Sequence, residues 1–157
     1  MMKLLMVCMG NICRSPMAQA VTWQLMEQAG LARTIEIDSA GTHAGRSRER
    51  LDPRAETVLS KRGYLIDKHR SRQVTEQDFE RYDLILAMDQ TNLNDLRQVC
   101  PGDHVHKLRL FLAFAQGVNN LDVPDPYFGN VQSFERVLDL CEAGASGLVK
   151  YHQNAPP

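Results

Sequence analysis

The sequence predicts an α/β fold with three layers, α/β/α, in which a parallel sheet lies between helices. Short apolar segments typical of buried strands alternate along the chain with segments whose apolar residues recur at helical spacing. Strands separated by helices are joined by right-handed crossovers, which make the sheet parallel. The length of 157 residues suits one domain with a substantial core. We therefore expect a single domain over residues 1–150 and a flexible tail over 151–157.

The first strand and the first helix flank a short loop. The apolar run 4–7 predicts a buried strand, and the spacing of apolar residues over 17–29 predicts a helix. Ser15 is a good N-cap and Pro16 suits the first helical position, so we expect the helix to begin there. The loop thus joins the C-terminal end of a strand to a helix N-terminus. Open α/β sheets bind ligands at such ends, and free N–H groups there collect anions.

The rest of the chain continues the alternation. Further strands are expected over 34–38, 83–87 and 105–108. Asp52 and Pro53 begin a second helix that Gly63 closes, and Asp89 caps a third. The last helix is expected over 131–148. The polar segments 43–51 and 67–73 are expected to connect these elements.

Composition excludes several classes of function. The formal net charge of −1 provides no overall field for binding nucleic acid or an anionic membrane. Residues 1–7 are too short an apolar run for a signal peptide, and no segment is long enough to span a bilayer. Four cysteines in a chain of this size do not indicate a disulfide scaffold. We therefore expect a soluble cytoplasmic protein, a monomer or weak dimer.

The loop after the first strand carries the chemistry. Five residues separate Cys8 from Arg14, enough to wrap the backbone around one tetrahedral oxyanion. Gly10 allows close approach of the chain, and Asn11 tolerates positive φ. Successive N–H groups form an anion nest, Arg14 adds a planar fork, and both favour the thiolate of Cys8. Ser15 could donate a further hydrogen bond to that sulfur. The alternative is a buried cysteine beside a surface arginine. The phosphate-binding candidates are Met9, Gly10, Asn11, Ile12, Cys13 and Ser15.

Phosphate transfer to sulfur also requires a proton for the leaving group. The carboxylate candidates are Asp89, Asp122 and Asp125. We favour Asp125 because Pro126 stiffens its loop, and because Tyr127 and Phe128 can form a wall for a flat ring. The alternative is that Asp125 only starts a turn.

No metal site or cofactor is expected. Cys8 and Cys13 have a weak spacing for zinc, with no second pair nearby. His104 and His106 alternate on a possible strand, where a solvated edge is the simpler interpretation.

These motifs resemble the low-molecular-weight protein tyrosine phosphatase family of cysteine phosphatases. The resemblance covers residues 3–148 and rests on Cys8-x5-Arg14-Ser15, on Ser39-Ala40-Gly41-Thr42 and on Asp125-Pro126-Tyr127. It implies a flavodoxin-like domain with a four-stranded, twisted, parallel sheet. It also implies hydrolysis of phosphotyrosine and aryl phosphates through a cysteinyl-phosphate intermediate. In that reaction Cys8 would be the nucleophile, Arg14 would bind phosphate and stabilise the transition state, and Asp125 would be the general acid and then the base.

The resemblance also bears on three supporting residues. Ser39 lies at a strand end, where it can brace Asn11 or serve as an ordinary turn residue. His69, followed by Arg72-Gln73, matches a family segment in which the histidine supports the loop, although a surface histidine is the alternative. Cys13 can capture an oxidised Cys8 as a disulfide or act as a small buried thiol.

Substrate class is predicted from two observations. A cysteine at the bottom of a deep cup suits a long aryl phosphate. Relatives that resemble protein-arginine phosphatases carry Thr where this chain has Ile12, so we expect phosphotyrosine to be preferred. The expected partner is a phosphotyrosine-containing protein, such as a bacterial tyrosine kinase or a host protein.

The chain departs from the family in its substrate wall. The family usually places an aromatic residue after Ser-Ala-Gly-Thr, whereas His43-Ala44-Gly45 and an arginine-rich run over 46–50 stand here. Peptide affinity is therefore expected to be weak or to depend on acidic substrate residues that meet Arg46, Arg48 and Arg50.

Two other functions share this loop. A thiol-linked arsenate reductase would need relay cysteines close together, and Cys100 and Cys141 are too scattered in the sequence. A non-catalytic phosphate-binding module would need the loop without a general acid.

Overall fold

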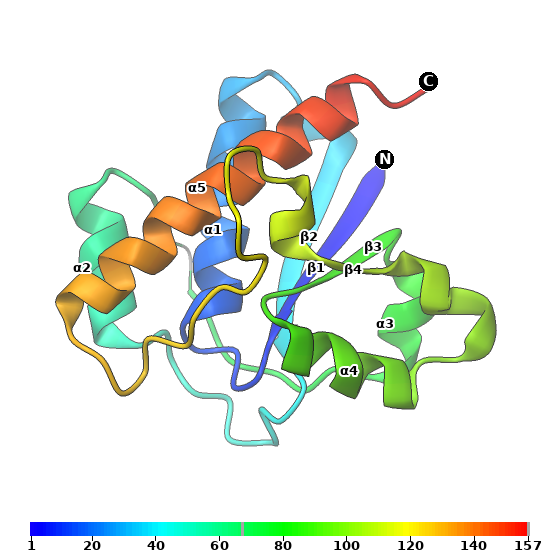
Figure 1. Ribbon diagram of the computed structural model, residues 1–157, viewed down its shortest axis with the longest axis horizontal. Coiled ribbons are helices and arrows are strands. Elements are labelled where there is room, and N and C mark those ends of the chain that lie inside the picture. Colours follow the sequence, from blue (N-terminus) through cyan, green and yellow to red (C-terminus); the bar gives the residue numbers. More distant parts are fainter. Residues whose placement is uncertain (67, 157) are drawn as a thin grey trace.

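The centre of the fold is a four-stranded parallel sheet in the order β2-β1-β3-β4 (Figure 1). The computed structural model describes residues 1–66 and 68–156. The strands are β1 (Met2–Cys8), β2 (Ile35–Gly41), β3 (Leu84–Ala87) and β4 (Leu108–Leu110). The α-helices are α1 (Arg14–Gln28), α2 (Pro53–Lys61), α3 (Glu76–Arg81), α4 (Gln90–Val99) and α5 (Val131–Gln153). Three 3₁₀ helices are η1 (Ala32–Thr34), η2 (Gly102–Lys107) and η3 (Phe111–Phe114).

Helices cover both faces of the sheet. Helices α1 and α5 pack together on one face with α2 beside them, and α3 and α4 lie on the other (Figure 1). Side chains alternate across β1, so that Leu4 and Met6 join one hydrophobic cluster while Leu5 and Val7 join another. Because both faces are buried, β1 is apolar throughout its central run. The predicted three-layer fold with a four-stranded parallel sheet is confirmed.

The first helix begins differently from the prediction. Helix α1 starts at Arg14 with Cys13 at its N-cap position, and no side chain caps it. Ser15 therefore lies inside the first turn, and the predicted N-cap role is wrong. Its hydroxyl contacts Cys8 Sγ at 3.0 Å, as was also predicted, and accepts from Asn11 Nδ2 at 2.9 Å. The side chain expected to cap the helix is thus part of the loop's own network.

The other predicted helix starts agree with the structure. Asp52 caps α2 and accepts from Arg54 N, with Pro53 at the first helical position. Asp89 caps α4 and accepts from Asn92 N. Helix α3 was not predicted, although Thr75 and Asp78 form a capping box at its start.

The last strand and the C-terminal segment need correction. Residues 102–107 form η2, so β4 begins only at Leu108, where it pairs with Ile85. Helix α5 continues to Gln153, and the predicted boundary between domain and tail therefore lies inside a helix. The Tyr151 ring packs edge-on against Phe114 at 5.1 Å, and His152 Nε2 contacts Thr34 Oγ1 at 2.8 Å. These contacts fix a turn that the sequence predicted to be loose.

The predicted segment 67–73 includes Asp67, which lies outside the described residues. No helix within the described residues is both long and apolar enough to cross a bilayer.

Helix α5 approaches η3 too closely for any side chain at Gly147. A Cβ added there would lie 1.7 Å from the carbonyl oxygen of Phe114, and backbone cannot yield as a flexible side chain can. We expect Gly147→Ala to lower the free energy of unfolding, because overpacking costs roughly 1–3 kcal/mol or more and exceeds the ~1 kcal/mol gained in helix propensity.

Thermal unfolding measures this effect. Ser146→Ala, at the exposed neighbouring position, is the matched control and should be neutral or slightly stabilising. An unchanged melting temperature in Gly147→Ala would show that α5 and η3 can separate at little cost.

Candidate active site

The loop between β1 and α1 lies at the C-terminal edge of the sheet, beside the end of β2. Thr42 N donates to Cys8 O at 2.9 Å, and His43 N donates to Met9 O at 2.8 Å. A Cβ at Gly41 would lie 2.6 Å from Met9 O, so the close approach of β2 to the loop requires glycine there. The end of β2 thus holds the first half of the loop in place.

Cys8 Sγ lies inside the loop and accepts hydrogen bonds from it. Asn11 N donates to the sulfur at 3.2 Å, and Ser15 Oγ lies 3.0 Å away. Asn11 Nδ2 donates to Ser15 Oγ, which leaves the hydroxyl proton available for the sulfur. The only other acceptor recorded for that hydroxyl among the described residues is Ala40 O, at 3.4 Å. This arrangement of donors suits a negatively charged sulfur.

Asn11 holds the strained centre of the loop. Its φ of 59° lies in the left-handed region, which costs free energy unless surrounding contacts hold it. Asn11 Nδ2 donates to Ser39 Oγ at 3.0 Å, and Asn11 Oδ1 accepts from Arg72 N at 3.0 Å. His69 Nε2 donates to Asn11 O at 2.7 Å. Burial lowers the pKa of His69, so the ring supports this carbonyl as a neutral donor.

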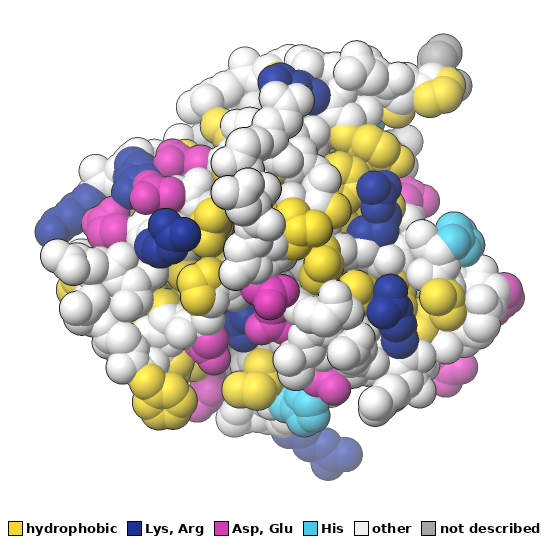
Figure 2. Space-filling model, viewed as in Figure 1, with side chains coloured by type: hydrophobic (Ala, Val, Ile, Leu, Met, Phe, Trp, Pro, Cys, Tyr) yellow, Lys and Arg dark blue, Asp and Glu magenta, His cyan; other side chains and the backbone are white. Residues whose placement is uncertain are grey.

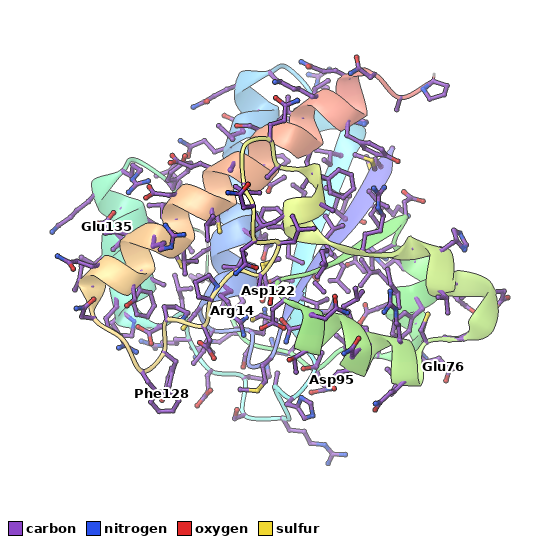
Figure 3. The ribbon with its side chains drawn as sticks, viewed as in Figure 1. Arg14, Glu76, Asp95, Asp122, Phe128 and Glu135 are labelled. Atoms are coloured by element: carbon purple, nitrogen blue, oxygen red, sulfur yellow. The ribbon has the colours of Figure 1, made fainter. Side chains whose placement is uncertain are left out.

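Arg14 is buried and held in one orientation. Its Nη1 donates to Asp89 Oδ2 at 2.6 Å and to Val123 O at 3.1 Å. Its Nη2 lies 3.8 Å from Asp125 Oδ2. Figure 3 labels Arg14 at the centre of the molecule, and Figure 2 shows basic and acidic side chains together there. Asp89, one of the three carboxylates considered as a general acid, is instead the partner that orients the guanidinium. Its cap position gave no sign of this contact.

A pocket of about 210 Å³ brings the predicted site residues together. It is lined by Cys8, Met9, Gly10, Asn11, Ile12, Cys13, Arg14, Asp125, Tyr127 and Phe128. Ser15, Ser39 and His69 lie behind the loop and support it through the contacts above. The arginine-rich segment 46–50 is not part of this lining.

The aromatic wall is open to solvent. Phe128 is 95% exposed and points outward, at the lower left of Figure 3, and Tyr127 is 45% exposed. Their rings meet edge-to-face at 4.9 Å. Asp125 Oδ1 accepts from Tyr127 N at 3.1 Å, so this carboxylate does form a turn as well as facing Arg14.

The other cysteines have environments that keep them protonated. Burial and the nearby Asp52 carboxylate raise the pKa of Cys13 to about 12. Burial also raises the pKa of Cys100 and of Cys141. At neutral pH these three side chains are therefore poor nucleophiles. Within residues 1–66 and 68–156, no cluster of three or more His, Cys, Asp or Glu side chains could hold a metal ion.

Sequence reasoning missed Arg54, which connects two parts of the site. It binds Asp52 and reaches the carbonyl of Tyr127. Its position two residues after the helix cap was the only sign in the sequence that it could bind Asp52. Nothing local to the sequence indicated the contact with residue 127.

The loop opens with Cys8 and closes with Arg14, and Asp125 lies over it, an arrangement typical of phosphatases. The profile of the family described as "Low molecular weight phosphotyrosine protein phosphatase" matches residues 3–155. The chain belongs to this family, as its motifs suggested.

Individual relatives agree with this assignment. The low molecular weight protein-tyrosine-phosphatase of Streptomyces coelicolor is 44% identical over 146 residues, covering 91% of this chain and 88% of the relative. A protein tyrosine phosphatase structure from Entamoeba histolytica has a TM-score of 0.93 at 37% identity, covering 98% of this chain and 97% of that one. The arginine phosphatase YwlE, in a Cys-to-Ser mutant with a phosphorylated active-site serine, has a TM-score of 0.87 at 28% identity, covering 98% and 97%.

Proposed function

We propose that this chain hydrolyses phosphotyrosine in proteins through a phosphorylated Cys8. In the first step the Cys8 thiolate forms a bond to phosphorus as the bond from phosphorus to the aryl oxygen breaks. Asp125 gives its proton to that oxygen, and the phenol leaves. In the second step the Asp125 carboxylate takes a proton from water, the water oxygen bonds to phosphorus, and the sulfur–phosphorus bond breaks.

The observation that carries this proposal is the shared pocket. Cys8, Arg14 and Asp125 line one small space, although Asp125 comes from a part of the chain distant from the loop that holds the other two. Arg14, fixed by Asp89, presents a planar donor pair to two phosphoryl oxygens as their charge develops. The loop's N–H groups supply further donors. Asn11, Ser39 and His69 keep the loop ready for the anion, so little reorganisation is needed on binding.

Phosphotyrosine is the substrate best matched by the pocket. Ile12 and the Tyr127 ring offer apolar surface to a phenyl ring. The guanidinium of a phosphoarginine substrate would gain less from contact with these side chains. It would also bring its positive charge beside Arg14. The arginine phosphatase resembles this chain in fold, so fold alone does not choose between the two substrates.

The arginine-rich segment favours acidic sequences around the phosphotyrosine. Arg46, Arg48 and Arg50 are exposed and make no ion pair with any described residue. Their segment is joined to the site at both ends, through His43 N to Met9 O and through Asp52 N to Ile12 O. We call the exposed side chains of Arg46, Arg48 and Arg50 the rim of the site. A tyrosine kinase or host protein with acidic residues beside its phosphotyrosine would match the charge of this rim. Because the reaction requires a reduced Cys8, we propose that the protein works in a reducing compartment such as the cytoplasm.

The substrate assignment is tested with peptides of one sequence that carry either phosphotyrosine or phosphoarginine. We expect kcat/KM to favour phosphotyrosine by about tenfold or more, because a difference in apolar contacts within a pocket changes kcat/KM by about that factor. Acidic flanks should raise kcat/KM a further two- to fivefold at low salt, as exposed ion pairs do, and the gain should vanish at high salt.

Charge reversal separates the two parts of this expectation. Arg46→Glu with Arg48→Glu should remove the flank effect, while Arg33→Glu, on η1 near the opposite end of β2, is the matched control. Preference for phosphoarginine would overturn the substrate proposal. Hydrolysis of all flanks alike would overturn only the role of the rim.

A further inference from the structure

Arg54 lies in the first turn of α2, between the phosphate-binding loop and the loop that carries Asp125. The N-cap of this helix, Asp52, is buried and donates its own N–H to Ile12 O at 2.9 Å. The start of α2 is therefore fixed to the phosphate-binding loop by backbone. Any side chain held by Asp52 has its position set relative to that loop.

The guanidinium is held by Asp52 in a two-point contact. Arg54 Nε lies 3.1 Å from Asp52 Oδ1, and Arg54 Nη2 lies 2.9 Å from Asp52 Oδ2. Its Cζ also lies over the Phe134 ring of α5, 4.6 Å from the ring centroid. The two hydrogen bonds and the ring contact fix the orientation of an otherwise flexible side chain.

The adjacent edge of the same guanidinium, formed by Nη1 and Nη2, holds the acid loop, the loop that carries Asp125. Arg54 Nη2 donates to Tyr127 O at 3.0 Å, and Arg54 Nη1 donates to Gly129 O at 3.3 Å. The Tyr127 ring lies near the cation as well, at 5.6 Å. Tyr127 is also the residue whose N–H donates to Asp125 Oδ1. The peptide units on both sides of Tyr127 are thus involved, one with Arg54 and the other with the carboxylate.

The acid loop has few other restraints. Asp125 and residues 127–130 are exposed, and Gly129 N to Pro126 O is the backbone hydrogen bond recorded within the loop. Without Arg54, the position of Asp125 over the pocket would depend on this turn, on the bonds of Val123 to Met88 O and Arg14, and on the 3.8 Å approach to Arg14.

We infer that Arg54 is a positioning residue that holds the Asp125 loop in register with the phosphate-binding loop during proton transfer. This inference rests on the proposed role of Asp125. Arg54 does not line the pocket, so it acts through the loop and not on the phosphate.

Leaving-group dependence tests the inference. We expect Arg54→Ala to lower kcat/KM for phenyl phosphate by up to about 100-fold, the loss typical of a misplaced catalytic group. Hydrolysis of 2,4-dinitrophenyl phosphate, whose leaving group needs no proton, should change little. Arg54→Lys keeps the positive charge but loses the planar pair of N–H donors, so its kcat/KM for phenyl phosphate should fall by an intermediate factor. In Asp125→Asn, adding Arg54→Ala should cause no further loss.

Arg62→Ala is the matched control for stability. Arg62 also joins α2 to α5, through Glu135, Asp139 and Glu142, but makes no recorded contact with the acid loop. It should lower the melting temperature without creating leaving-group dependence. Equal losses for both substrates in both Arg54 variants, or full additivity with Asp125→Asn, would overturn the inference. If Asp125→Asn itself shows no leaving-group dependence, the proposed acid has failed instead.

Discussion

Replacing Cys8 with serine is expected to reduce hydrolysis of aryl phosphates by about 10⁴-fold or more, the scale seen when a catalytic nucleophile is removed. A serine hydroxyl fits the space and can keep contacts with Asn11 N and Ser15 Oγ, so the fold and the anion site should survive. Its oxygen is not ionised at neutral pH, however, and the surrounding donors cannot supply the missing charge.

The measurement combines steady-state rates with phosphate binding. Cys8→Ser should still bind inorganic phosphate, which separates loss of the nucleophile from loss of the site. Cys100→Ser is the matched control, because Cys100 lies at the end of α4 and its thiol donates to Pro101 O. It should retain full activity. Substantial turnover in Cys8→Ser would show that phosphorus never passes through the sulfur.

Thiol labelling gives an independent check on the same residue. Burial raises the pKa of Cys13 to about 12, so Cys13 should not react with iodoacetate at neutral pH although it lies in the same loop. Brief treatment should therefore modify Cys8, and phosphate should protect it. Modification of Cys13 first would contradict this assignment.

The sequence predicted most strongly what short-range chemistry decides. Asn11 and the Asp52 and Asp89 caps each have a local physical reason, and the structure shows the expected geometry at all three. Gly10 differs, because a Cβ added there would meet only Ile12 Cγ1 at 3.9 Å, an ordinary contact. Strand and helix alternation likewise predicted the layers, because periodicity records which face of each element is buried.

Long-range contacts were less predictable. In the sequence Asp89 is fully explained as a helix cap. Its hydrogen bond to Arg14 depends on packing between residues that are 75 positions apart in the chain. Arg54 shows the same limit, since its partners at 127 and 129 lie across the active-site opening. Of the two roles expected of Ser15, the contact with Cys8 Sγ is present, but the N-cap role is wrong because the helix already begins at Arg14. Helix α5 was ended early because its last turn is stabilised by contacts with Phe114 and Thr34, not by its own pattern.

Replacing Asp125 with asparagine should have the second-largest effect. General acid catalysis contributes about 10²–10⁴-fold, so kcat/KM for phenyl phosphate should fall within that range. Asparagine can still accept from Tyr127 N through its Oδ1, so the turn should persist while the proton donor is lost. A substrate with a good leaving group should be affected far less.

The pH dependence of kcat/KM assigns the role more directly. An acid must be protonated to act, so the wild-type rate should fall as the pH rises through its ionisation. Asp125→Asn should lose that basic limb, whereas Cys8→Ser should be inactive at every pH. Asp122→Asn is the matched control, because this neighbouring carboxylate accepts from Gln90 N and does not line the pocket with Cys8. If the basic limb persists in Asp125→Asn and disappears in Asp122→Asn, Asp122 is the acid. If both variants keep the basic limb, the proton comes from water or from another group.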